Sequence, residues 1–220
     1  FYSAHYKIDV YRYFSLKKGY HALIDLDMLA INSVPNIFKF YLKNKINLLF
    51  NLNSNYKKKN KIHNKKILNS LKICNRLENN TAEWYGGEFV VGNHKFFNYI
   101  YKTIKTLYKN YLANYKRLHH QGDEMLLNSS IQVLKHNRNF KFKDISNNKI
   151  ITRYWSINTI SKQRPLSFHL KHFLIHLPAD KIFLSNIDIL EDTHESIKLK
   201  GGIVKSTLLN SPVLISIFSK

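Results

Sequence analysis

Apolar residues recur every three to four positions along several stretches of the chain, which is the spacing of an amphipathic helix. The pattern predicts helices over residues 5–16, 94–118 and 125–134, with Gly19 ending the first of them. The same spacing makes a polar helix over 64–76 a reasonable alternative to an irregular segment.

Short apolar runs bounded by turn residues predict strands between these helices. The run 22–29, interrupted by two aspartates, is expected to be a buried strand whose end carries carboxylates. Further strands are expected at 83–92, which is framed by glycines, and at 149–155 and 170–177. Strands that alternate with helices favour an α/β sheet, and we expect one domain over residues 1–184.

Two regions depart from this pattern. Residues 51–66 are almost all Asn, Lys, Ser, Tyr and His, which predicts an exposed, mobile basic loop. Residues 185–220 carry no motif, and we treat them as a C-terminal extension without an assigned role. The chain opens without Met, and we expect an N-terminal piece to be missing from it.

The composition is strongly basic, with 35 Lys and Arg against 14 Asp and Glu and a net charge of +21. Such a charge attracts nucleic acid, anionic lipid or a diphosphate, although an A+T-rich genome produces the same Lys and Asn bias. Cys74 has no cysteine partner in the chain, which fits a reducing compartment. No apolar run of about 18 residues is present, so no spanning helix is expected. We predict a cytoplasmic location, peripheral on the membrane if the basic run 56–66 contacts anionic lipid.

Candidate chemistry begins at Asp25 and Asp27, which directly follow the apolar run Ala-Leu-Ile. Carboxylates in such a place are costly unless they serve a site. Carboxylate oxygens hold divalent cations, and a cation neutralises the charge of a diphosphate leaving group. Two solvated turn aspartates are the alternative interpretation.

Three further groups are weaker on their own. Asp9 and Arg12 lie one helical turn apart and form either a surface ion pair or a sugar-binding pair. Asp123 and Glu124 stand at a helix start, where acidic residues are also ordinary. His176 and Lys181 follow a predicted strand, and His176 alone fits a core histidine equally well.

The order of these motifs is more specific than any one of them. The run Lys7-X-Asp9-X-X-Arg12, followed by Asp25-X-Asp27, resembles the Asp-X-Asp glycosyltransferases of the GT-A fold, in the sugar-binding-region family. The segment 123–128 is similar to the D-Q-D-X-L-N segment of bacterial lipopolysaccharide galactosyl- and glucosyltransferases. His176 to Lys181 is similar to their H-X-X-G-X-K segment.

This resemblance implies a GT-A-like, Rossmann-related mixed sheet flanked by helices, whose first strands have no counterpart in this chain. It implies transfer of a hexose from a nucleotide sugar, with UDP-sugars favoured, to a surface-polysaccharide or lipid-linked saccharide acceptor. The cofactor would be Mn²⁺ or Mg²⁺, and the biological setting would be bacterial lipopolysaccharide or capsule synthesis. Retention of configuration is favoured on the same ground.

The resemblance also assigns roles to residues. Asp27 and His176 would bind the metal with Asp25, which would also touch the ribose or the sugar. The remaining roles concern the donor sugar and its diphosphate. Asp9, Arg12, Gly86 and Gly87 would contact the donor, Asp123 and Glu124 would line the reacting face, and Lys181 would meet the diphosphate.

The sequence departs from the family pattern in places. Ala179 replaces the glycine of the last motif, and no Pro-Trp follows Lys181. Glu124 replaces a family glutamine, which leaves retention or inversion open.

A nucleic-acid-binding protein without catalytic activity is the main alternative. It would use the positive charge and the 14 Tyr and 14 Phe. However, Phe96, Phe97, Tyr101 and Tyr108 follow helical spacing among aliphatic residues, which indicates core packing. No helix-turn-helix, zinc or RNP pattern is visible, so nucleic acid is the less favoured partner.

Overall fold

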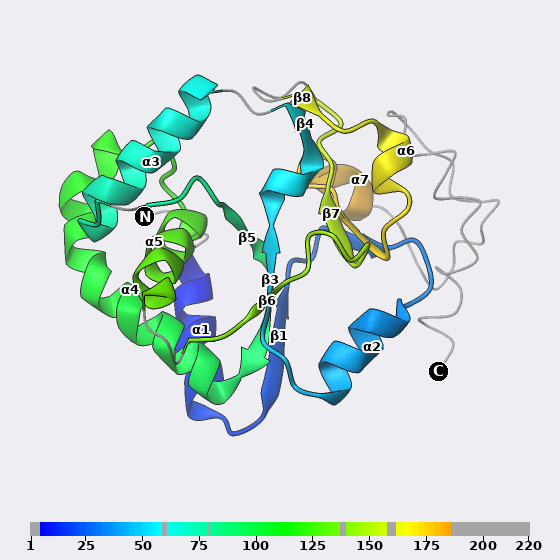
Figure 1. Ribbon diagram of the computed structural model, residues 1–220, viewed down its shortest axis with the longest axis horizontal. Coiled ribbons are helices and arrows are strands. Elements are labelled where there is room, and N and C mark those ends of the chain that lie inside the picture. The colour runs from blue at the N-terminus through cyan, green and yellow to red at the C-terminus, as the bar shows by residue number, and fades with distance from the viewer. Residues whose placement is uncertain (1–4, 59–60, 79, 137–139, 158–161, 186–220) are drawn as a thin grey trace.

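The computed structural model describes residues 5–58, 61–78, 80–136, 140–157 and 162–185 and shows a mixed α/β arrangement (Figure 1). The helices are α1 (Tyr6–Leu16), α2 (Asn36–Lys43), α3 (Lys61–Asn75), α4 (His94–Asn114), α5 (Asp123–Lys135), α6 (Leu166–His169) and α7 (Lys181–Ser185), with short 3-10 helices η2 (Leu52–Asn55) and η3 (Tyr115–Arg117). The strands are β1 (Tyr20–Ile24), β2 (Met28–Ala30), β3 (Leu48–Asn51), β4 (Tyr56–Lys58), β5 (Tyr85–Asn93), β6 (Lys143–Asp144), β7 (Ile151–Arg153), β8 (Lys162–Gln163) and β9 (Leu174–His176).

The largest sheet has the strand order β1-β5-β3-β6. Strand β5 is antiparallel to both β1 and β3, whereas β6 is parallel to β3. Helices α1, α3, α4 and α5 lie on one side of this sheet (Figure 1). A second sheet with the order β2-β9-β7 lies on the other side with α2, α6 and α7, and β4 pairs with β8.

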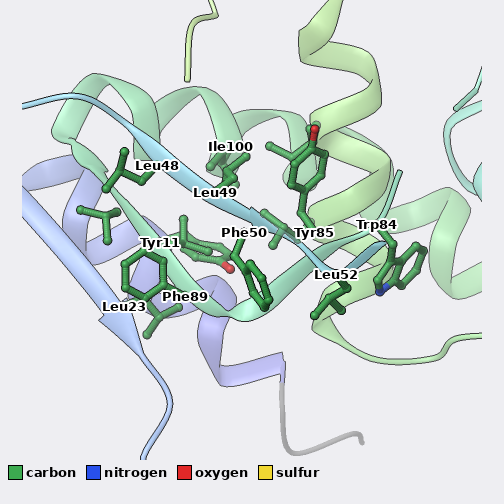
Figure 2. Packing of buried hydrophobic residues seen from close by; sticks show 14 of the residues in the cluster. Tyr11, Leu23, Leu48, Leu49, Phe50, Leu52, Trp84, Tyr85, Phe89 and Ile100 are labelled. Atoms are coloured by element: carbon green, nitrogen blue, oxygen red, sulfur yellow. The ribbon is translucent and has the colours of Figure 1, made fainter. Parts of the chain in front are cut away.

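The hydrophobic core forms around β3 and β5. All four residues of β3 are buried, and Figure 2 shows Leu49 and Phe50 packed among Tyr85, Phe89 and Ile100. Fully burying one such side chain contributes about 1.5–3 kcal/mol. The sheet and the α4 face therefore form a rigid base for the polar residues that follow the strands.

The chain passes from the first sheet to the second at residues 25–27. The backbone N–H of Asp25 donates to the carbonyl of Glu88 at 3.0 Å, which extends the pairing of β1 with β5. The carbonyl of Asp27 accepts from the N–H of Leu177 at 2.9 Å, which begins the pairing of β2 with β9. The two aspartates are thus fixed by different sheets on either side of the exposed Leu26.

Several sequence predictions are confirmed. Helices α1, α4 and α5 fall on the three predicted segments, and α3 includes 64–76 apart from its last residue. Phe96 and Phe97 are buried in the core, as their spacing indicated.

The predicted strand 22–29 is wrong in extent, because the chain turns between β1 and β2. It is also only partly buried, since β1 is an edge strand and Ile24 is exposed. The predicted strand 170–177 is shortened to β9, because residues 170–173 form a turn after α6. The strand predicted at 83–92 corresponds to β5, and Gly86 and Gly87 lie inside it.

The exposed loop predicted at 51–66 is also wrong over much of its length. Asn51 ends β3, η2 and β4 follow, and α3 begins at Lys61. Leu52 and Asn55 are buried. Contact of this segment with an anionic membrane stays a prediction.

The C-terminal extension predicted at 185–220 lies outside the described residues, except for Ser185. Across the described part of the chain, none of the helices combines the length and the apolar character needed to cross a bilayer.

Candidate functional site

A cleft of about 840 Å³ opens where the two sheets meet the start of α5. The side chains that line it come from α1, from the turn between β1 and β2, and from the segments around α5, β7 and β9. The charged or titratable residues among them are Lys7, Asp25, Asp27, His120, Asp123, Glu124, Arg153, His176 and Lys181. The cleft is therefore polar and carries both signs of charge.

Asp25, Asp27 and His176 converge in this cleft, and we call them the acidic triad. One ligand atom from each lies within 4.8 Å of the others. Strand register brings them together, because Met28 pairs with His176 across β2 and β9. Asp27, one residue earlier, is thereby placed beside His176, although the two are far apart in sequence.

His176 is held between two carboxylates. Its Nε2 lies 3.0 Å from Asp27 Oδ1, and its Nδ1 lies 3.3 Å from Glu88 Oε1. Burial alone would lower the pKa of His176, but the two carboxylates raise it to about 9. Burial would raise the pKa of Asp27, but the hydrogen bond and charge of His176 lower it to about 2. Without a metal the pair is therefore an ion pair at neutral pH.

Lys7 joins two of the predicted carboxylates. Its Nζ lies 2.8 Å from Asp25 Oδ1 and 3.3 Å from Asp123 Oδ2, and it donates to the Gly87 carbonyl at 3.2 Å. Burial would lower the pKa of Lys7, but the charges of Asp123 and Asp25 outweigh burial and raise it. Lys7 therefore stays charged and fixes α1 against the site.

Arg153 forms the second internal cation. Its Nε and Nη2 contact the Glu88 carboxylate at 2.9 and 2.5 Å, and Nη2 also pairs with Glu124. Register explains this position, because Arg153 is the partner of His176 across β7 and β9. Glu88 is fully buried, and Arg153 and His176 outweigh that burial and keep its pKa low.

Glu124 is positioned by the start of β5. Trp84 Nε1 donates to its Oε2 at 2.8 Å, and the Gly87 N–H donates to Oε1 at 3.3 Å. Four residues later on α5, Asn128 accepts from the Tyr85 N–H at 2.7 Å and donates to the Tyr85 carbonyl at 2.8 Å. The Asn128 side chain therefore docks α5 onto β5 and fixes where Glu124 points.

Gly86 and Gly87 of β5 make room for this network rather than lining the cleft. A Cβ on Gly86 would lie 2.0 Å from Glu88 Oε2, and one on Gly87 would lie 2.7 Å from Asp123 Oδ2. Both distances are shorter than any real contact. Their role as donor contacts stays a prediction.

The structure does not bring Asp9 and Arg12 to the site. Both side chains are exposed on α1, and neither is among the described residues that line the cleft. Lys181 does line the cleft, with Nζ 3.5 Å from Asp27 Oδ2 and a side chain that is 70% exposed.

Sequence reasoning assigned no role to Lys7, Glu88 or Arg153. Lys7 was part of the first motif, but the carboxylates that pair with it, Asp25 and Asp123, come close to it only in the folded protein. Glu88 and Arg153 are 65 residues apart and meet only through strand register. A charged residue inside an otherwise apolar predicted strand was the one available signal for each of them.

The acidic triad fits a hard divalent cation. Asp27 Oδ2 is buried and accepts no hydrogen bond from the described residues, with the Lys181 ammonium 3.5 Å away, whereas Asp25 Oδ1 is already paired with the Lys7 ammonium at 2.8 Å. Two carboxylates with one imidazole suit Mn²⁺, and oxygen ligands suit Mg²⁺. Glu88 at Nδ1 would orient His176 so that Nε2 faces the ion, as carboxylates do behind metal-bound histidines.

Comparison with protein-family models, with curated proteins and with solved structures finds no match to this chain. Its function is therefore argued from the cleft and its residues.

Proposed function

We propose that this protein is a divalent-metal-dependent glycosyltransferase with a GT-A-like fold, which transfers a hexose from a nucleotide sugar to a saccharide acceptor. The observation that carries the proposal is the convergence of Asp25, Asp27 and His176 in one cleft. These residues belong to motifs from separate parts of the sequence, and chance similarity gives no reason for Asp25, Asp27 and His176 to meet, although Asp9 and Arg12 of the first motif lie outside the cleft.

The metal would be held by Asp27 and His176, with Asp25 beside them. Mn²⁺ or Mg²⁺ bound there would neutralise the donor diphosphate and make the nucleoside diphosphate a better leaving group. His176 has to lose its proton to act as a ligand, so metal binding would release a proton.

Lys181 would meet the diphosphate as a point charge. Its exposed ammonium group lies at the cleft beside Asp27, where it is accessible to a bound phosphate. As the bond between the sugar C1 and the phosphate oxygen breaks, negative charge grows on the leaving group, and a fixed cation stabilises that charge.

Asp123 and Glu124 would face the sugar, where positive charge develops. Arg153, Trp84 and the Gly87 N–H hold the Glu124 carboxylate in one orientation. A carboxylate fixed in this way stabilises an oxocarbenium-like centre electrostatically. Lys7 would position Asp123 and Asp25 through the ion pairs already described. Retention stays the favoured outcome on resemblance alone.

The acceptor is proposed as a surface polysaccharide or a lipid-linked saccharide, with UDP-sugars as the favoured donors. The basic nucleic-acid binder remains the rival proposal, since the net charge of +21 also suits a polyanion. Steeply salt-dependent binding of random oligonucleotides, without any binding of nucleotide sugars, would favour that rival.

A melting-temperature screen against UDP-, GDP- and CMP-sugars, each with and without Mn²⁺, tests the proposal. We expect one nucleotide class to stabilise the protein only when Mn²⁺ is present. Asp27→Asn should lose this stabilisation, and Asp9→Asn serves as the matched control because Asp9 lies outside the cleft. Stabilisation by no nucleotide sugar, or equal stabilisation of the Asp27→Asn variant, would overturn the proposal.

A further inference from the structure

Three histidines outside the acidic triad bring their imidazole nitrogens together, and we call them the histidine triad. His63 lies on α3, and His119 and His120 lie between η3 and α5. One ligand nitrogen from each lies within 4.8 Å of the others, and all three side chains are half-buried. His119 Nε2 and His63 Nδ1 are 2.9 Å apart.

The rings meet edge to face rather than stacked. The interplanar angles are 77° for His63 with His119, 82° for His63 with His120, and 67° for His119 with His120. No two of the rings are stacked, and one nitrogen from each ring lies near the nitrogens of the other two. The arrangement therefore suits a shared ion.

The backbone holds these rings in place without an ion. The His119 N–H donates to Ser70 Oγ at 2.8 Å, and Ser70 is buried on α3. Ser70 lies seven residues after His63, which is two helical turns and the same helix face. Helix α3 therefore fixes the histidine segment at two points.

We propose that the histidine triad binds a Zn²⁺ ion. Three imidazoles form a nitrogen set typical of this metal, with Zn–N distances of about 2.0–2.1 Å in tetrahedral geometry. That geometry separates ligand nitrogens by about 3.3 Å. The 2.9 Å hydrogen bond between His119 and His63 would therefore have to break and open by tenths of an ångström, and nitrogens near the 4.8 Å limit would have to close by up to about 1.5 Å. Within the described residues this group offers no fourth ligand, which leaves one position for water or a substrate oxygen.

The surrounding charges support neutral imidazoles. Burial lowers the pKa of each of the three, and that of His120 falls to about 4. Neutral imidazole is the form that binds metal. Lys66 opposes an added cation near His63 and His119, and near His120 Glu124 attracts one while Arg153 repels one.

The histidine triad also adjoins the cleft. His120 lines it, and the His120 ring lies 4.7 Å from the Trp84 ring, which donates to Glu124. An ion bound here would link α3 to the segment that leads into α5 and its two acidic residues. This inference depends on the three histidines alone and does not require glycosyl transfer.

Titration of tag-free, metal-stripped protein with Zn²⁺, followed by calorimetry, tests the site. We expect one Zn²⁺ per chain at the histidine triad, and a loss of affinity of at least about 100-fold in both His63→Gln and His119→Gln. His136→Gln is the matched control, because His136 is an exposed histidine outside both triads. Asp27→Asn should keep the same Zn²⁺ affinity.

Co²⁺ replaces Zn²⁺ in a second measurement that reports the ligand set directly. We expect the visible absorption of tetrahedral Co²⁺ in the native protein and its loss in His63→Gln, whose far-ultraviolet circular dichroism should match the native spectrum. Absence of Zn²⁺ binding at 100-fold excess over a protein concentration of about 10 μM would overturn the inference. So would native Zn²⁺ affinity in both His63→Gln and His119→Gln. Loss of binding in Asp27→Asn alone would overturn it as well, because the ion would then belong to the acidic triad.

Discussion

The acidic triad and the histidine triad each bring three ligand atoms within 4.8 Å of one another, yet they differ in charge. His176 is paired with Asp27 and Glu88, which raise its pKa to about 9. His120 has burial and other histidines around it, and its pKa falls to about 4. The same side chain is therefore a cation in one cluster and a neutral base in the other.

This difference predicts different ions for the two clusters. Carboxylate oxygens favour Mn²⁺ or Mg²⁺, whereas neutral imidazoles favour Zn²⁺. An ion at the acidic triad has to displace a proton from His176, whereas an ion at the histidine triad has to break the hydrogen bond between His63 and His119. The metal that a buried histidine can bind therefore depends on whether carboxylates or other imidazoles lie beside it, and not on its burial alone.

The largest expected effect separates the two clusters by activity. Asp27→Asn should reduce Mn²⁺-dependent sugar transfer by at least about 10³-fold, because a missing metal contact costs about 4 kcal/mol in the transition state. Its Zn²⁺ affinity, measured by calorimetry, should stay within about 2-fold of native. Transfer by Asp27→Asn at the native rate would remove the acidic triad from the reaction.

A pH series separates the two clusters by stability in the absence of metal. The folded pKa of His176 lies above its unfolded value of 6.5, so its contribution is complete below pH 6.5 and is lost as pH rises through about 9. The folded pKa of His120 lies below 6.5, so its contribution is complete above pH 6.5 and is lost as pH falls through about 4. Each shift corresponds to about 3 kcal/mol.

The measurement is urea unfolding in EDTA between pH 4 and 9.5, with His176→Gln and His120→Gln compared with the native protein. The difference in unfolding free energy should change between pH 6.5 and 9 for His176→Gln and between pH 6.5 and 4 for His120→Gln. Asp27, Glu88 and Arg153 face His176, and their own titrations lie outside the alkaline window. If the two difference curves changed in the same direction with pH, the opposite charge states proposed for His176 and His120 would be contradicted.

A smaller effect is expected from the residue behind His176. Glu88→Gln keeps the shape of the side chain but removes the charge that orients Nδ1, so Mn²⁺ affinity should fall by about 10–100-fold. Zn²⁺ affinity at the histidine triad should not change. Arg153 keeps its ion pair with Glu124 in this variant, so its charge stays compensated, and circular dichroism should show a folded protein. Unaltered Mn²⁺ affinity in Glu88→Gln would mean that Glu88 stabilises the fold but does not orient His176 for metal binding.

The sequence predicts the helices of this fold better than its strands. Helices α1, α4 and α5 follow a repeated apolar spacing, which a single sequence displays directly. Strand β3 and helix α2 were not anticipated, and β3 has only three apolar residues in a row, without alternation, before Asn51. Its burial results from pairing with β5 and β6, which are distant in the chain.

The same limit applies to the candidate site. The acidic triad was predictable, because its aspartates follow an apolar run and its motifs occur in a recognisable order. Glu88 and Arg153 acquire their roles from the register of β5, β7 and β9, which the sequence does not display. The histidine triad depends on how α3 packs beside the segment before α5, and no local pattern joins His63 to His119.

The smallest expected effect concerns the pair that sequence placed at the donor. Asp9→Asn and Arg12→Gln should change the kcat/KM of sugar transfer by less than about 2-fold, as exposed substitutions usually do. Each residue of a helix advances the side-chain direction by about 100°, so the side chains of Lys7 and Asp9 point about 160° apart. Lys7 faces the cleft, and Asp9 faces the opposite side of α1. A loss of 10-fold or more in Asp9→Asn, with native metal affinity, would show that a bound donor reaches the outer face of α1. The cleft would then extend past Lys7, and the acidic triad would form only its inner end.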